Sequence, residues 1–160
     1  MADGARGVVV GLQRSKGGVP KTQVDSAEIT AAGMDGDWQQ NRKYHGGPER
    51  ALCLYSMDLI EALQAEGHPI VAGSVGENVT IAGLDWRLMQ PGCTVEIGPV
   101  HLEVASFAAP CDTIRNAFSD KRFVRIGERR NPGWSRVYVR VVTAGMMRVG
   151  DPVTVRESYK

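Results

Sequence analysis

Short apolar runs separated by glycine and proline recur along the chain and predict β-strands. Segments of this kind lie at residues 8–12, 51–55, 94–97, 100–105, 137–141 and 153–155. In the runs 100–105 and 137–141, apolar and polar residues alternate, which is the pattern of a strand with one buried face. Gly98-Pro99 separates two of the runs and predicts a hairpin between them.

The segment "SMDLIEALQAEGHP" (56–69) is the one with a clear helical pattern. Ser56 can cap its N-terminus, and Gly67 followed by Pro69 ends it. The residues that share its apolar face are Leu59, Ile60 and Leu63. A second, shorter helix is predicted through "DTIRNAF", directly after Cys111.

Many short strands with glycine turns and little helix favour a mainly β fold, either an antiparallel barrel or a sandwich. The segments "MQPGCTVEIG" (89–98) and "MRVGDPVTVRE" (147–157) share a turn-then-strand pattern. We interpret them as two similar edges of a barrel. No low-complexity linker or run of charge divides the sequence, so residues 1–160 are predicted to form one domain.

The charge balance narrows the classes of partner. Nineteen Lys and Arg residues stand against eighteen Asp and Glu residues, which leaves a formal charge of +1. Non-specific nucleic-acid binding needs a larger basic excess. The sequence has no apolar run of the roughly 18 residues that a membrane span requires, and the apolar stretch near its start is too short for a signal peptide. We therefore expect a cytoplasmic protein with no nucleic-acid or membrane partner.

Three cysteines, an odd number, do not indicate a disulfide framework, and their spacing fits no zinc motif. Cys53 lies inside the apolar run "ALCLY" and is interpreted as a buried core thiol, while Cys93 lies in a turn. Cys111 follows Pro110 and precedes the second predicted helix. It is either a structural thiol at a turn or a reactive thiol, because a helix N-terminus and nearby arginines favour the thiolate.

A basic group lies toward the C-terminus of the chain. Its members are Lys121, Arg122, Arg125, Arg129, Arg130, Arg136 and Arg140. Guanidinium groups bind phosphate or carboxylate in a bidentate manner, so the group indicates either a site for a small anion or a solvated strand face. Arg136 is the strongest candidate because "PGWSRVYVR" places it beside a tryptophan at the start of a strand.

Two loops carry further candidate residues. In "RKYHGGPERALCLYS" (42–56), ionisable side chains surround a Gly-Gly-Pro turn ahead of a predicted strand. In "GSVGENVTI" (73–81), Glu77 and Asn78 follow two glycines and precede an apolar strand. Neither loop is a P-loop, and the sequence contains no G-x-G-x-x-G, G-x-S-x-G or H-E-x-x-H motif. Nucleotide binding through those motifs, serine hydrolysis and zincin chemistry are therefore unsupported.

Several of these segments together resemble a known family. "KYHGGPERALCLY", "GSVGENVTIAGLDW", "QPGCTVEIG", "APC" and "GWSRVYVRVVTAGMMRVGD" occur in the order seen in the molybdenum cofactor sulfurase C-terminal (MOSC) domain family. The resemblance extends from about residue 7 to residue 155 and is that of a stand-alone member. It implies a β-barrel with few helices that binds the molybdenum cofactor (molybdopterin). Relatives include bacterial proteins that detoxify N-hydroxylated bases and the mitochondrial amidoxime-reducing component.

The resemblance also implies roles for residues. Cys111 matches a candidate ligand of molybdenum, for which soft thiolate sulfur is suited. His45 would either donate a hydrogen bond to an oxo group or move a proton, and Gly46 and Gly47 would let the backbone approach the cofactor. The cationic residues expected at the cofactor and its phosphate are Lys43, Arg50 and Arg136, with Glu77 and Asn78 lining the opposite side. Around Cys111 the sequence lacks the basic residues found near this cysteine in catalytic relatives.

Three hypotheses follow. The first is an enzyme that reduces N-hydroxylated small molecules with electrons from a separate reductase. The second is a non-catalytic carrier of the cofactor, or of sulfur as a Cys111 persulfide. The third is an anion-binding barrel without catalysis. Pyridoxal phosphate, used by a desulfurase domain fused to some relatives, is not expected to form an aldimine here, because only Lys43 of the five lysines lies in a candidate pocket.

Overall fold

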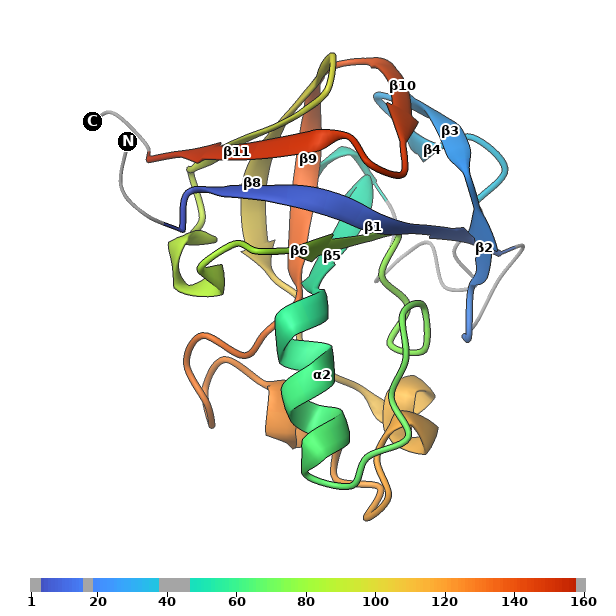
Figure 1. Cartoon of the computed structure of the whole chain (residues 1–160), viewed down its shortest axis with the longest axis vertical. Coiled ribbons are helices and arrows are strands. Elements are labelled where there is room, and N and C mark those ends of the chain that lie inside the picture. Colours follow the sequence, from blue (N-terminus) through green and yellow to red (C-terminus); the bar gives the residue numbers. More distant parts are fainter. Residues whose placement is uncertain (1–3, 16–18, 38–46, 158–160) are drawn as a thin grey trace.

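Seven strands close into a β-barrel (Figure 1). The computed structural model describes residues 4–15, 19–37 and 47–157 of the chain. Around the barrel the order is β1 (Arg6–Arg14), β11 (Pro152–Arg156), β7 (Thr94–Ile97), β8 (Val100–Phe107), β9 (Val137–Thr143), β5 (Leu52–Ser56) and β6 (Val79–Ala82). Pairing of β6 with β1 completes the ring. The mainly β barrel predicted from the sequence is confirmed.

One pair in the barrel departs from the antiparallel pattern. Strands β5 and β6 run parallel, whereas the other described strand pairs are antiparallel. Parallel neighbours cannot be joined by a tight turn and need a crossover. Helix α2 (Met57–Ala65) supplies it, since the chain passes from β5 through α2 and a loop before it enters β6. Among the described residues no helix is long and apolar enough to cross a membrane.

Four further strands lie outside the closed ring. Strand β2 (Thr22–Val24) extends the sheet from β1. The strands β10 (Gly145–Arg148), β3 (Ser26–Thr30) and β4 (Gly33–Met34) form a small separate sheet. The two segments interpreted as similar barrel edges correspond to β7 and β11, which are direct antiparallel neighbours.

The barrel interior is filled by the apolar residues of the alternating pattern. On β9, Val137 and Val139 pair with Leu54 and Leu52 of β5, and Leu54 in turn pairs with Val79 of β6. All five of these side chains are fully buried. Paired residues of adjacent strands point to the same side of a sheet, so this set lines one continuous core.

Helix α2 begins as the sequence predicts and packs beyond one end of the barrel (Figure 1). The Ser56 hydroxyl accepts a hydrogen bond from the Leu59 amide (3.1 Å), and Gly67 follows the helix with a left-handed φ of 98°. Ile60 and Leu63 are buried in the same core as the barrel residues. The segment after Cys111 forms a short 3-10 helix, η3 (Asp112–Ala117), rather than an α-helix.

Candidate functional site

The predicted site residues of the barrel lie on the side of β5 and β9 that faces away from its interior. Cys53 pairs with Tyr138 across these strands, and together with Ala108 they form a small buried cluster separate from the main core. Arg136 precedes Tyr138 by two residues, so its side chain leaves the backbone on the same side. Loops cover this outer face, because Cys53, Tyr138 and Arg136 are all buried.

The Arg136 guanidinium binds backbone carbonyls of two loops. Nη1 donates to the Val75 carbonyl oxygen (2.8 Å), and Nη2 donates to the carbonyl oxygens of Ala108 (3.5 Å) and Ala109 (3.3 Å). Its Nε is buried and has no hydrogen-bond partner among the described residues. Arg136 therefore fixes the backbone that leads into Cys111 and ties it to the loop that leads into Glu77.

The segment that carries Arg136 is itself anchored by two aromatic side chains. The Trp86 indole Nε1 donates to the Ser135 carbonyl oxygen (2.7 Å), and the Tyr55 hydroxyl donates to the Trp134 carbonyl oxygen (2.8 Å). The Tyr55 and Trp86 rings pack edge to face, with centroids 6.0 Å apart. The entrance to β9 is thus held in one position by buried groups.

Cys111 lies on the surface side of this arrangement. It is half-buried and immediately precedes η3. Its Sγ lies 2.8 Å from the Thr113 hydroxyl oxygen. The pKa of Tyr138 is raised to about 12, first by burial and then by the charge of Cys53, and Cys111 contributes in the same direction. Cys111 is therefore reachable from outside, whereas Tyr138 is buried.

The loop before β5 reaches the same face. Its short helix η1 (Pro48–Arg50) begins after Gly47, whose φ of 97° is left-handed and favours glycine. The Arg50 guanidinium carbon lies 5.4 Å from the centroid of the Tyr138 ring, which is the geometry of a cation–π contact. Lys43, His45 and Gly46 lie outside the described residues.

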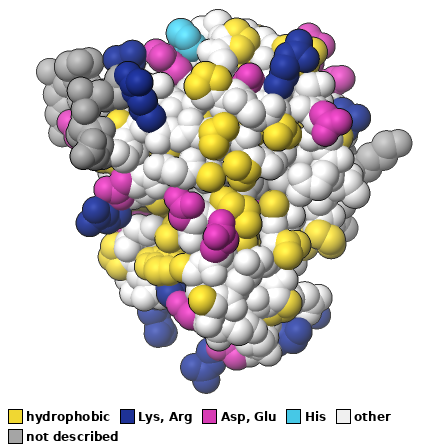
Figure 2. All heavy atoms as spheres, in the orientation of Figure 1, with side chains coloured by type: hydrophobic (Ala, Val, Ile, Leu, Met, Phe, Trp, Pro, Cys, Tyr) yellow, Lys and Arg dark blue, Asp and Glu magenta, His cyan; other side chains and the backbone are white. Residues whose placement is uncertain are grey.

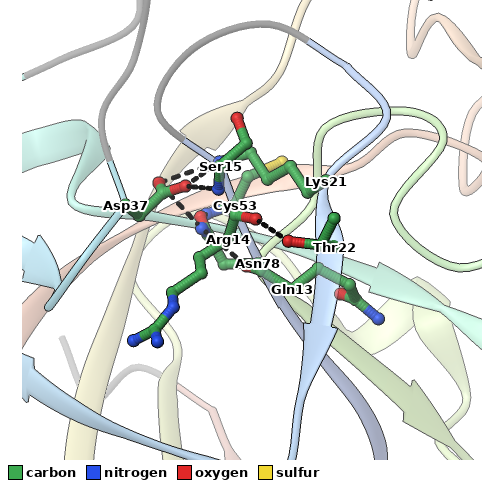
Figure 3. Close-up of polar contacts among 8 residues, drawn as sticks. All are labelled: Gln13, Arg14, Ser15, Lys21, Thr22, Asp37, Cys53 and Asn78. Carbon is green, nitrogen blue, oxygen red and sulfur yellow. Dashed lines mark hydrogen bonds and ion pairs between the residues drawn. The ribbon is translucent and has the colours of Figure 1, made fainter.

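Asn78 belongs to a buried polar network (Figure 3). Its Oδ1 accepts from the Cys53 amide (3.0 Å), and its Nδ2 donates to the Gln13 carbonyl (3.3 Å) and to Asp37 Oδ2 (3.0 Å). Asp37 also pairs with Lys21 (2.8 Å), and both side chains are more than nine-tenths buried. The Asn78 side chain therefore connects β1, β5 and the segment after β4 that carries Asp37.

Glu77 is completely buried beside this network. Its Oε2 accepts a hydrogen bond from the Thr80 hydroxyl (3.0 Å), while Oε1 has no partner among the described residues. Burial raises the pKa of the Glu77 carboxyl above its ordinary value. Backbone amides, the Thr80 hydroxyl and, to a smaller extent, the positive charge of Arg136 oppose this effect. A carboxyl of this kind binds a proton more tightly in the folded chain than in the unfolded chain.

We predict that Glu77→Gln flattens the pH dependence of stability. Because the folded pKa lies above the ordinary 4.5, the wild-type chain is most stable below that value and loses stability as pH rises through the folded pKa. A neutral amide removes this loss. Melting temperatures measured between pH 4 and pH 8 should therefore fall less in the variant. Glu157→Gln, at an exposed position, serves as the control, and parallel curves for wild type and Glu77→Gln would contradict the argument.

The other two cysteines are enclosed. Cys53 and Cys93 are both 3% exposed. Burial raises the pKa of the Cys53 thiol to about 11 and also raises that of Cys93. The interpretation of Cys53 as a buried core thiol is confirmed. Cys111 is thus the one described cysteine that is open to a ligand.

The basic group seen in the sequence does not form one pocket. Arg125 pairs with Glu66 through two hydrogen bonds (3.0 and 2.7 Å) and lies over the Trp134 ring. Arg140 pairs with Glu103 on the barrel wall. Figure 2 shows basic side chains at the lower end of the molecule, spread over its surface. Among the members of the group, Arg136 is the one that bonds the loop before Cys111.

The closed barrel carries a half-exposed cysteine in the segment after β8, and a buried arginine binds the backbone just before this cysteine. Residues 41–154 match the family described as MOSC domain, and the chain belongs to this family. It is 32% identical over 98 residues to protein YiiM of Escherichia coli (strain K12) and 26% identical over 118 residues to the uncharacterized protein YflK of Bacillus subtilis (strain 168). These alignments cover 58% and 73% of the chain, but only 44% and 52% of the relatives.

Solved structures share the fold at lower identity. The crystal structure of YiiM from Escherichia coli superposes with a TM-score of 0.73 at 22% identity, over 97% of this chain and 71% of that one. The YUAD protein from Bacillus subtilis gives a TM-score of 0.74 at 17% identity, over 97% of both chains. In the sequence alignments with YiiM and YflK, by contrast, the chain spans about half the length of these curated relatives.

The residues at the site fit the cofactor that the family resemblance implies. Cys111 offers a soft sulfur donor that is open to a ligand, and Arg50 and Arg136 bring positive charge to the same face. The buried Arg136 Nε is a donor that the described protein groups leave unused. Among the described residues no three His, Cys, Asp or Glu side chains gather as a metal-binding group.

Reasoning from the sequence missed two side chains of this face. Tyr138 was assigned only to a strand, although its alternation with Arg136 in "SRVYVR" places both on one side. Thr113 was assigned only to a helix, although it stands two residues after Cys111. The contacts of Asn78 with residues 13, 37 and 53 carry no signal in a single sequence, because they join segments far apart in the chain.

Proposed function

We propose that this chain binds the molybdenum cofactor on the outer face of β5 and β9 and reduces N-hydroxylated compounds, with Cys111 as the molybdenum ligand. The observation that carries the proposal is the half-exposed Cys111 thiol in a MOSC domain, two residues after Ala109, whose carbonyl oxygen accepts a hydrogen bond from Arg136. The substrates are small hydroxylamines or N-hydroxylated bases, the electrons come from a separate reductase, and the reaction takes place in the cytoplasm.

The residues of the proposed site divide into ligand-binding and positioning groups. Cys111 provides sulfur to the metal, and Arg50, together with Lys43, provides positive charge for the phosphate of the pterin. Gly46 and Gly47 would let the backbone approach the cofactor. Arg136 acts mainly by positioning, since its guanidinium is bonded to the carbonyls of Ala108 and Ala109 just before Cys111.

Glu77 and Asn78 would hold the loops on the side of the cofactor opposite to the cationic residues. The Asn78 amide is bonded to Asp37, which ends the described part of the loop before residue 47. Through this contact Asn78 would hold the chain from which Lys43 and His45 extend. Glu77 would keep the loop of residues 73–78 in place through Thr80.

The bound cofactor would supply two-electron oxygen-atom transfer. The overall reaction converts R–NH–OH, two protons and two electrons into R–NH2 and water. His45 would deliver a proton to the departing oxygen, because imidazole exchanges protons near neutral pH. Burial of Tyr138 and Cys53 keeps water away from the inner side of the site. Pyridoxal phosphate is not part of the proposal, and Lys21 is already paired with the buried Asp37.

The test combines metal analysis with turnover. The full chain is purified from a host that makes the molybdenum cofactor and, in parallel, from one that cannot. Molybdenum bound near one atom per chain, with reduction of an N-hydroxylated base when a flavoprotein reductase and its electron donor are added, is the expected result. Protein from the cofactor-deficient host should be inactive. Equal activity from both hosts would overturn the proposal.

The same experiment addresses the carrier alternative, which the exposure of Cys111 also supports. A carrier of the cofactor would bind molybdenum but fail to reduce any N-hydroxylated base. A carrier of sulfur would show a persulfide on Cys111, visible by mass spectrometry as an added sulfur that a thiol reductant removes. A chain that contains neither molybdenum nor a persulfide would favour the third hypothesis, the anion-binding barrel without catalysis.

A further inference from the structure

Positive charge is concentrated in one segment of the chain. Residues 111–130 contain six of the nineteen Lys and Arg residues but only three of the eighteen Asp and Glu residues. The rest of the chain holds thirteen basic and fifteen acidic residues, so the basic excess belongs to this segment alone. The segment lies below the barrel in Figure 1, and Figure 2 shows basic side chains at the same end of the molecule.

Four cations of this segment have no ion-pair partner among the described residues. Arg115 pairs with Asp112, and Arg125 pairs with Glu66. The four that remain are exposed: Lys121, Arg122, Arg129 and Arg130. Their charges are therefore available to a partner.

The two other carboxylates of the segment offset these charges only in part. Asp120 accepts a hydrogen bond from the Arg122 backbone amide (3.0 Å), and Glu128 accepts one from the Gly133 amide (3.0 Å). Two negative charges thus stand beside four positive ones. The surface keeps a positive balance.

An apolar side chain lies among the four cations. Val124, in the short helix η4 (Phe123–Ile126), is 43% exposed. Tight turns keep its neighbours together, since the Gly127 amide donates to the Val124 carbonyl (2.9 Å) and the Asn131 amide donates to the Gly127 carbonyl (2.9 Å). An apolar centre with a charged rim is the anatomy of a protein–protein interface. The five exposed residues that form this η4 surface are Lys121, Arg122, Val124, Arg129 and Arg130.

The η4 surface is held rigidly next to Cys111. Helix η4 packs against η3, which begins directly after Cys111. A methyl group placed on Gly127 would lie 3.3 Å from the ring of Pro110, the residue before this cysteine. Arg125 ties η4 to Glu66 at the end of α2. A partner that docks here would meet a preformed surface beside the candidate metal ligand.

Lys121 has a backbone conformation that disfavours lysine. Its φ of 62° is left-handed, and among the described residues no other non-glycine residue has a positive φ. Glycine and asparagine adopt this conformation more readily. The Lys121 ammonium donates to Asn116 Oδ1 on η3 (3.2 Å). Strained backbone of this kind clusters at functional sites, which points to a use for the side chain.

We propose that the η4 surface is the docking site of the electron donor, and that this donor is a flavoprotein with an acidic face. The proposal rests on the proposed function and specifies its partner. The reduced flavin would give up two electrons and two protons, which are the numbers that conversion of R–NH–OH into R–NH2 and water consumes. Redox complexes are small and transient, and complementary charge sets their encounter rate. Four cations around one exposed valine match that type of interface.

Two electron donors separate docking from chemistry. The full chain, purified with its cofactor, reduces an N-hydroxylated base with electrons either from reduced flavodoxin, a small acidic FMN protein, or from reduced methyl viologen, a small molecule that needs no docking. We expect kcat/KM for flavodoxin to fall at least about tenfold when salt rises from about 0.05 M to about 0.5 M. Turnover with methyl viologen should change far less.

Charge variants locate the docking site. Arg129→Gln combined with Arg130→Gln should lower kcat/KM for flavodoxin at least about fivefold, with molybdenum content and viologen-driven turnover unchanged. The matched control, Arg6→Gln combined with Arg148→Gln, removes two exposed charges from β1 and β10, away from η4 (Figure 1). It should leave both activities as in the wild type. Equal losses in the two double variants would mean that only net charge matters and would overturn the docking site.

Lys121→Asn tests the strained position separately. Asparagine suits the left-handed backbone and lacks the charge. The variant should melt no lower than the wild type and still lose about two- to threefold in kcat/KM for flavodoxin. Unchanged kcat/KM would exclude the Lys121 side chain from the docking site.

Direct binding distinguishes failure of this inference from failure of the proposed function. Flavodoxin binding, measured by titration calorimetry, requires no turnover. Salt-sensitive binding that the Arg129 and Arg130 substitutions weaken would support the docking site even if neither donor drove reduction, a result that would overturn the proposed function. Turnover with viologen but none with flavodoxin would overturn the docking site alone. Loss of binding to a single-stranded RNA, with flavodoxin binding unchanged, would assign the surface to nucleic acid and also overturn it.

Discussion

Cys111→Ser is expected to abolish molybdenum-dependent turnover and to leave the fold intact. A hydroxyl is close in size to a thiol, but it is a hard donor of weak acidity and cannot replace a soft thiolate. The half-exposed position of Cys111 and its place in a loop mean that the substitution removes no core contact. The measurements are molybdenum content, reduction of an N-hydroxylated base, and the melting temperature. Full metal content together with full turnover would exclude Cys111 as the ligand.

Cys53→Ser is the matched control for this variant. Cys53 is buried against Tyr138 and Ala108, and a serine hydroxyl there would lack water. The cost in the free energy of unfolding should be about 1–3 kcal/mol, while activity per folded molecule is retained. The two substitutions are chemically identical. If Cys53→Ser lost activity and Cys111→Ser kept it, the buried thiol and not the half-exposed one would form the functional centre.

Arg136→Ala should produce the largest loss of stability and of bound cofactor among the arginine variants. Its removal takes away the side-chain donor to the carbonyls of Val75 and Ala109 and one of the two side-chain donors to that of Ala108. It also takes a positive charge away from the buried Glu77. Truncating a buried, hydrogen-bonded charge costs roughly 2–5 kcal/mol. Molybdenum content should fall more steeply than the fraction of folded protein, since the backbone before Cys111 is released.

Arg129→Ala is the control for this prediction. Arg129 is exposed in the loop "GERRNPG", and an exposed charge contributes under about 1 kcal/mol. Unfolding by denaturant and molybdenum analysis are carried out on both variants. Equal cofactor retention by Arg136→Ala and Arg129→Ala would remove Arg136 from the site and leave it a purely structural residue.

The strands of the barrel were largely predictable because burial on one face leaves a period of two in the sequence. The valines of β9 and the hairpin turn at Gly98 between β7 and β8 are examples. Strands β3 and β10 lie outside the closed barrel and are short. In β3 the buried Ala27 and Ile29 alternate with exposed residues, but the pattern extends over only five residues, and β10 buries Met147 alone. The parallel pairing of β5 and β6 was not predictable either, because both strands are almost entirely buried and show no alternation.

The candidate site was predictable where chemistry is local. The two loops and Cys111 were found because glycines and ionisable side chains gather within a few residues. The hydrogen-bond partners of these residues could not be predicted from such local patterns. Asn78, for example, looked like a group that could face a ligand, but its amide is bonded to Cys53 and Asp37, which are 25 and 41 residues away. Such contacts exist only after the barrel has closed.

The pairing of β1 with β11 has a consequence for biosynthesis. These strands lie at opposite ends of the described chain, so the barrel cannot close on the ribosome until residues 152–156 have emerged. Until then β1 and β7 each present an unpaired edge, which invites association with other chains. Contacts of such long sequence separation also form slowly. A nascent chain of this protein therefore passes through a period in which two strand edges are open, and translation that stops short of β11 would yield an open sheet instead of a smaller barrel.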